Sequence, residues 1–129
     1  MATQVKKIVI PGRLPGLNEY IDACRRDSRI GNRMKREAED AVIWAAKASL
    51  RGKILTPCIM QYTWYEPNRR RDLDNISAFG RKVIQDALVQ AHYLPGDGWA
   101  CIAGFQDTFR VDKKNPRIEI QILEVKDNE

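Results

Sequence analysis

The sequence of 129 residues has one histidine, three cysteines and no long hydrophobic run, and each shortage excludes a class of protein. No Ser/His/Asp set suggests itself around the single histidine, His92, and no histidine or cysteine neighbour supports a metal-ligand role for it. Cys24, Cys58 and Cys101 are odd in number, widely spaced and form no C-x-x-C. This argues against a disulfide framework and a zinc site, and we expect reduced thiols.

Membrane and targeting signals are also missing. No apolar run approaches the roughly 18 residues of a membrane span, and residues 1–7 lack the apolar core of a signal peptide. We therefore expect a cytoplasmic protein without a membrane partner. Neither of the common glycine-rich nucleotide motifs occurs, so a nucleotide cradle is not expected.

Size and composition indicate a single folded domain. A chain of 129 residues is long enough to bury about two thirds of its unfolded surface. A hydrophobic content of 43% and a charged content of 30% are ordinary for a soluble globular protein. We predict one domain over residues 1–129.

Positive charge is concentrated in one short segment. The chain carries a net charge of +5, and the segment 25–36 alone holds six cations against one anion, Asp27. Such a segment attracts polyanions, most often nucleic acid, although a basic loop without a ligand is an equal alternative. The DNA-binding candidates here are Arg25, Arg26, Arg29 and Arg33.

Apolar residues at helical spacing predict two main helices, over about 32–50 and 76–91. The second has the clearest stripe, made of Ile76, Phe79, Val83, Ile84, Ala87, Leu88 and Ala91. Gly80 inside it costs about 1 kcal/mol relative to alanine, which slightly favours close packing there. His92 is expected in the last turn. Residues 18–28 have no clear pattern but could include a helical turn.

Alternating and β-branched runs predict four strands, over 5–11, 56–66, 99–109 and 116–124. The order is therefore β-α-β-α-β-β, an α/β (α+β) domain with a four-stranded sheet flanked by two main helices. We expect the tail, residues 125–129, to fray.

The stretch from Arg69 to Asn75 places three cations against two carboxylates, between a strand and a helix. In extended backbone Asp72 and Asp74 project to one side, where they could share a divalent cation. Asn75 is a suitable N-cap, and the positive helix end beside it would also accept a phosphate. The alternative is a solvated loop with weak surface ion pairs.

A third carboxylate, Asp97, follows the second helix in the turn 94–98. A turn aspartate often serves its own backbone. If Asp97 converges on Asp72 and Asp74, mutual repulsion would require a cation, and oxygen-only ligands suit Mg²⁺.

The order of three motifs resembles the RusA-type Holliday-junction resolvases: Arg70-Arg71-Asp72-Leu73-Asp74-Asn75, then Asp86-Ala87-Leu88, then Gly96-Asp97. The resemblance implies a Mg²⁺-dependent homodimeric endonuclease that places paired nicks in four-way DNA junctions. It also implies a small mixed sheet flanked by helices, and catalytic, metal-binding roles for Asp72, Asp74 and Asp97. Arg69, Arg70 and Arg71 adjoin these carboxylates and complete the DNA-binding candidates.

One position departs from the family pattern. The family has an essential lysine three residues after the asparagine and four residues before the Asp-Ala-Leu motif. In this sequence the first spacing leads to Ala78, whereas the second leads to Lys82. A long helical side chain leans toward the N-terminus, so the Lys82 ammonium could pass over Ala78 toward the carboxylates and act in catalysis. The equal alternative is a surface lysine paired with Asp86.

Taken together, the sequence predicts a structure-selective endodeoxyribonuclease that acts on branched DNA in recombination and repair. One alternative is a module of the same fold that holds branched DNA without cutting it. Another is an interaction domain whose basic segment binds an acidic protein.

Overall fold

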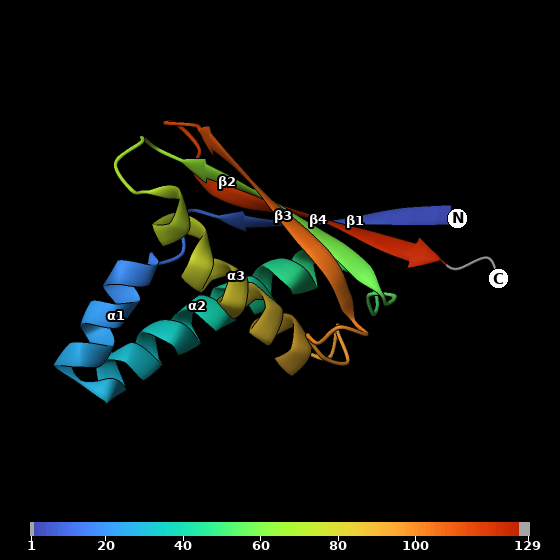
Figure 1. Ribbon diagram of the computed structural model, residues 1–129, viewed down its shortest axis with the longest axis horizontal. Helices are drawn as coiled ribbons and strands as arrows, with labels where there is room; N and C mark the ends of the chain where they lie inside the picture. The colour runs from blue at the N-terminus through green and yellow to red at the C-terminus, as the bar shows by residue number, and fades with distance from the viewer. Residues whose placement is uncertain (1, 127–129) are drawn as a thin grey trace.

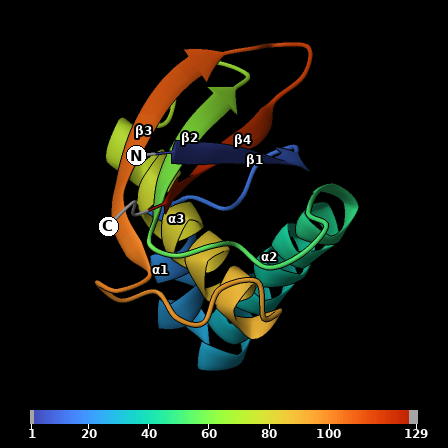
Figure 2. The same cartoon turned by 90° about the vertical axis from the view of Figure 1, so that its right-hand side faces the viewer.

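Four strands form one mixed sheet, and three helices cover one of its faces (Figures 1 and 2). The computed structural model describes residues 2–126. The elements, in chain order, are β1 (Ala2–Pro11), α1 (Leu17–Arg26), α2 (Ser28–Ser49), β2 (Cys58–Glu66), α3 (Leu73–Gln90), β3 (Ile102–Val111) and β4 (Arg117–Lys126). The chain is thus an α/β domain of order β-α-α-β-α-β-β, with one helix more than the sequence predicted.

The strands lie in the order β1-β4-β2-β3. β4 pairs antiparallel with both β1 and β2, whereas β2 and β3 are parallel. A parallel pair needs a crossover connection, and α3 supplies it. β3 consequently forms one edge of the sheet, and its last residue, Val111, lies beside Glu66 at the end of β2.

Alternation along the central strands builds the core, as predicted. In β2 the side chains of Cys58, Met60, Tyr62 and Trp64 are buried, while the residues between them are only partly covered. In β4 Ile118, Ile120 and Ile122 face the same way. The helices supply the other side of this core, mainly through the apolar stripe of α3.

Gly80 lies where α3 crosses β2, and the predicted close packing is confirmed. A Cβ atom at this position would lie 2.8 Å from the Trp64 ring. Glycine therefore lets the helix approach the largest buried side chain of the sheet.

Two helices lie where one was expected before β2. α1 occupies the segment without a clear pattern, and of its residues only Ala23 is fully buried. α2 begins at Ser28, not near residue 32, because Asp27 caps it by accepting a hydrogen bond from the Arg29 amide at 2.9 Å. The basic segment therefore spans the joint between two helices instead of a loop.

The start of α3 corrects a second prediction. The helix begins at Leu73 with Asp72 as its N-cap residue, so Asp74 lies inside the first turn. Asn75 is not the N-cap: its Oδ1 accepts a hydrogen bond from the Asn18 amide at 2.8 Å. A Cβ on Gly16 would lie 2.8 Å from the same oxygen. The Asn75 side chain, predicted to cap α3, thus instead joins the start of α3 to the start of α1.

Several boundaries also differ from the predictions. His92 lies beyond the C-cap Ala91, with a left-handed backbone (φ 66°), so it is outside the last helical turn. β3 begins at Ile102 instead of residue 99. Val125, expected to fray, continues β4 in pairing with Thr3, while residues 127–129 lie outside the described part of the chain.

Candidate metal and nucleic-acid site

The loop between β2 and α3 is held in place by a buried ion pair. Arg71 donates to both carboxylate oxygens of Glu66, at 3.0 and 2.8 Å, and to the carbonyl oxygen of Leu14 at 3.3 Å. Glu66 is 5% exposed and also pairs with Arg13 at 3.1 Å. The Arg71 guanidinium therefore has its hydrogen-bond partners within the protein, unlike those of Arg69 and Arg70, its neighbours among the DNA-binding candidates.

Asp72 and Asp74 present two uncommitted carboxylates at the start of α3. Both residues are exposed, and within residues 2–126 neither side chain has a hydrogen-bond or ion-pair partner. The free amides at a helix N-terminus make this end positive, which favours anionic groups beside it. The arginines that adjoin the two carboxylates in sequence do not pair with them.

Asp97 lies beyond α3, in the turn that leads to β3. Its Oδ2 is 3.5 Å from the Lys82 ammonium, which also contacts Asp86 at 3.0 Å. The hydrogen bond to Asp86 is the main cause that raises the Lys82 pKa. Lys35 of α2 completes this network at 3.2 Å from Asp86. The expected direction of Lys82 is not observed: it leans toward Asp86 and Asp97, as in the surface-pair alternative.

Within one chain the three aspartates do not converge. Among the described residues no group of three or more His, Cys, Asp or Glu side chains is placed to hold a metal ion. The helix rise between Asp74 and Lys82 is about 12 Å, which separates Asp97 from the first pair. Asp72 and Asp74 nevertheless match the ligands of Mg²⁺, which is commonly held by one or two carboxylates together with waters and substrate phosphates.

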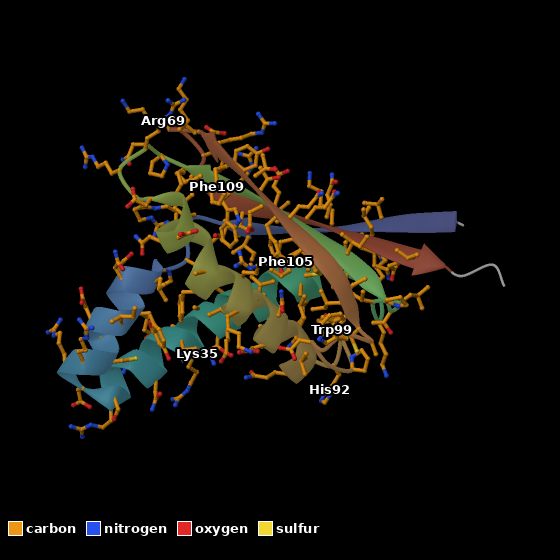
Figure 3. All side chains as sticks on the ribbon, in the orientation of Figure 1. Lys35, Arg69, His92, Trp99, Phe105 and Phe109 are labelled. Atoms are coloured by element: carbon orange, nitrogen blue, oxygen red, sulfur yellow. The ribbon has the colours of Figure 1, made fainter. Side chains whose placement is uncertain are left out.

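A cleft of about 560 Å³ opens beside Asp72, between the start of α3 and the last residues of β3. Its apolar wall consists of Leu73, Ile76, Phe109 and Val111. Its charged lining residues are three arginines and three carboxylates: Arg69, Arg71, Arg110, Glu66, Asp72 and Asp107. In Figure 3, Arg69 and Phe109 lie at one end of the sheet, whereas His92 and Trp99 lie at the other.

Phe109 and Arg110 were not among the predicted site residues. They reach the site only because β3 runs parallel to β2, which brings residue 110 beside Tyr65. Nothing local in the sequence indicates that strand order.

Unpaired arginines lie on both sides of the carboxylates. At the end of the sheet the side chains of Arg69, Arg70 and Arg110 have no ion-pair partner among residues 2–126. At the joint of α1 and α2 the same holds for Arg25, Arg26 and Arg33.

Arg29 differs from the other candidates at this joint, because it pairs with Asp27 at 2.9 Å and lowers the pKa of that carboxyl group. It is therefore tied to the cap of α2.

The two cation clusters flank the start of α3. The Asn18–Asn75 hydrogen bond joins the first turns of α1 and α3, and α1 then leads to Arg25 and Arg26 over a rise of about 12 Å. The loop 67–72 leads in the opposite direction to the end of the sheet (Figure 1).

Comparison with protein-family models and with curated protein sequences gives no match. No helix in residues 2–126 is long and apolar enough to cross a membrane. Function is therefore inferred from the residues of the site and from their geometry.

Proposed function

We propose that the protein is a Mg²⁺-dependent, structure-selective endodeoxyribonuclease that resolves four-way DNA junctions in the cytoplasm, in recombination and repair. The observation that supports this most directly is the separation of charge at the start of α3. Asp72 and Asp74 have no partner in the described chain, although Arg69 and Arg70 lie close to them in sequence and are also unpaired. Carboxylates for a cation, beside arginines for phosphates, are what phosphodiester cleavage requires.

The residues of the chain have distinct tasks in this proposal. Asp72 and Asp74 would hold Mg²⁺, which supplies a nucleophilic water and offsets charge on the phosphodiester. The first amides of α3 and the guanidinium groups of Arg69 and Arg70 would position the phosphate. Arg25, Arg26 and Arg33 would hold a neighbouring part of the DNA backbone.

A homodimer offers a route by which Asp97 joins this site. β3 is an edge strand of 10 residues with Phe105 and Val111 about half exposed, and such an edge is a template for pairing with another chain. Antiparallel pairing of two β3 strands would run the first residues of one beside the last residues of the other. Asp72 lines a cleft together with Val111, so Asp97 of the partner subunit would approach it. Lys82 of the partner subunit would accompany Asp97, because the two side chains are paired.

A labelled four-way junction, incubated with and without Mg²⁺, tests the proposal. We expect paired nicks only when Mg²⁺ is present, and junction binding in both conditions. The variant Asp72→Asn should bind the junction without cutting it. Uncut junction in the presence of Mg²⁺, despite tight binding by the unaltered protein, would reject the enzymatic proposal.

That last outcome would favour a non-catalytic module that holds branched DNA. The observation in its favour is the distance between Asp97 and the other two aspartates within a single chain. The presence of Asp72 and Asp74 without a neutralising partner among the described residues argues against it, since a purely DNA-binding surface gains nothing from unpaired carboxylates.

A further inference from the structure

Two of the apolar residues that line the cleft beside Asp72 are about half exposed to solvent. Leu73, the first residue of α3, is 56% exposed, and Val111, the last residue of β3, is 49% exposed. Phe109 is half-buried between them and packs against the core from this side. The apolar wall is thus continuous with the core but open to a ligand.

Cations at the edge of the cleft indicate the kind of ligand. Arg69 and Arg110 line the cleft and have no ion-pair partner in the described chain, whereas the lining carboxylates Glu66 and Asp107 are each paired with an arginine. A ligand that complements both features has a flat, largely apolar part and an anionic part. A nucleotide combines the two, with a base that stacks on apolar and aromatic groups and phosphates that bind arginine.

The cleft is preformed. One wall belongs to α3, whose preceding loop is fixed by the Glu66–Arg71 ion pair. The other belongs to β3, which is tied to the same glutamate by a hydrogen bond of 2.8 Å from the Asp112 amide to the Glu66 carbonyl oxygen. Both walls are therefore tied to one residue, Glu66, and such preorganisation lowers the entropic cost of binding.

We propose that this cleft takes one unstacked nucleobase of branched DNA, adjacent to the phosphate at Asp72, while Arg69 and Arg110 contact the phosphates that flank it. The inference rests on the proposed function and adds the source of its selectivity. A continuous duplex must unpair and unstack a base to fill the cleft, whereas a branch point presents bases that unstack at lower cost. The cleft would thus favour branched over linear DNA without reading sequence.

The experiment pairs removal of a base with truncation of the cleft. Equilibrium binding is measured without Mg²⁺ on a four-way junction in which single nucleotides near the branch point are made abasic, one at a time. For the unaltered protein we expect one position at which loss of the base weakens binding about tenfold. The variant Leu73→Ala should bind the intact junction more weakly by about the same factor. Its binding should weaken little further when that base is absent.

Leu55→Ala is the matched control, because Leu55 is also half exposed (49%) but precedes β2, roughly 30 Å from the cleft along that strand. It should bind like the unaltered protein and keep the full abasic effect. Val111→Thr, with Val5→Thr as its control, repeats the test on the other wall with almost no change in volume.

The outcomes separate this inference from the proposed function. If loss of the base and the Leu73→Ala change weaken binding independently at every position, the nucleobase site is overturned, even if Mg²⁺-dependent nicking is observed. Absence of junction binding by the unaltered protein would overturn both proposals. If Leu73→Ala instead dissociates a dimer in sedimentation and shows no coupling, a second copy of the chain occupies the cleft and the inference is wrong.

Discussion

Glu66 and Arg71 form a two-pronged ion pair across the loop that leads into α3, with N–O distances of 3.0 and 2.8 Å. The pair joins the end of a central strand to the segment that carries Asp72. Glu66 is almost fully buried, and its ion-pair partners are Arg71 and Arg13. The site is consequently positioned by the core of the fold and not by a free loop.

The first prediction concerns this ion pair. Arg71→Ala removes the two-pronged partner of a buried carboxylate, and we expect it to lower the free energy of unfolding by about 3 kcal/mol. Arg70→Ala, which removes an exposed and unpaired arginine, should change it by less than about 0.5 kcal/mol. Urea unfolding of both variants measures the difference. Equal effects of the two substitutions would show that the pair does not support the loop.

The second prediction concerns Gly80. Alanine normally favours a helix over glycine by about 1 kcal/mol, but here the added Cβ would lie 2.8 Å from Trp64. We therefore expect Gly80→Ala to destabilise the protein by about 1–3 kcal/mol. Gly104→Ala is the control, because a Cβ at Gly104 meets nothing within 4 Å. A Gly80→Ala protein more stable than the original would mean that the Trp64 ring can shift aside.

Local pattern explains much of the fold and less of the site. The apolar stripe of α3 and the alternation of β2 and β4 were recognisable in the sequence. In each of these segments apolar residues recur at a regular spacing on the face that packs against the core. α1 was missed because it has only 10 residues and its N-cap residue, Gly16, has no side chain to mark the start of the helix. The strand order that brings residues 109–111 to the site arises from pairing between distant segments.

The start of α3 illustrates the same limit on a smaller scale. Asp72 and Asn75 are both good N-cap residues, so sequence alone could not choose between them. The choice follows from Asn18, 57 residues before Asn75, whose amide binds the Asn75 side chain.

The third prediction is a pH dependence that arises at Glu119. Hydrogen bonds from Arg117 at 2.7 Å, and then Lys7 at 3.1 Å, lower the pKa of Glu119 below its usual 4.5. A lowered folded pKa contributes stability that is present above pH 4.5 and is lost as the pH falls through the folded pKa. Glu119→Gln should therefore lose less stability than the original protein on acidification below pH 4.5.

Urea midpoints at neutral and acidic pH measure this effect. Glu37→Gln, on an exposed part of α2 without an ion pair in the described chain, is the control and should behave like the original protein. An identical loss on acidification for Glu119→Gln and the original protein would exclude Glu119 as the source.

The fourth prediction concerns the joint of α1 and α2. Replacing Arg25 and Arg26 with Gln should weaken binding to all junction sequences alike and flatten the salt dependence by up to about 2 units of slope, near 0.9 for each lost phosphate contact. Arg29 is left in place because it supports the cap of α2. Replacing Lys47 and Arg51 with Gln removes the same charge at the other end of α2 and should leave the slope unchanged. Equal slopes for the two double variants would show a general charge effect instead of contacts at the joint.

The last prediction tests whether the site is shared between two copies of the chain. Asp72→Asn and Asp97→Asn should each abolish cutting. If Asp97 of the partner subunit completes the site, a mixed dimer of the two variants has one site with both changes and one with neither. Randomly exchanged copies would then restore cutting at roughly a quarter of all sites, as single nicks instead of paired ones.

Mixing Asp72→Asn with Asp74→Asn is the matched control, since both changes fall on the same side of the shared site and every mixed dimer keeps two damaged sites. Denaturing gels that resolve single from paired nicks give the readout. If the first mixture stays as inactive as its components while sedimentation shows mixed dimers, Asp97 either acts within its own chain or takes no part in cutting. We expect the shared site because, among the described residues of one chain, Asp97 pairs with Lys82 and forms no metal-binding group with Asp72 and Asp74.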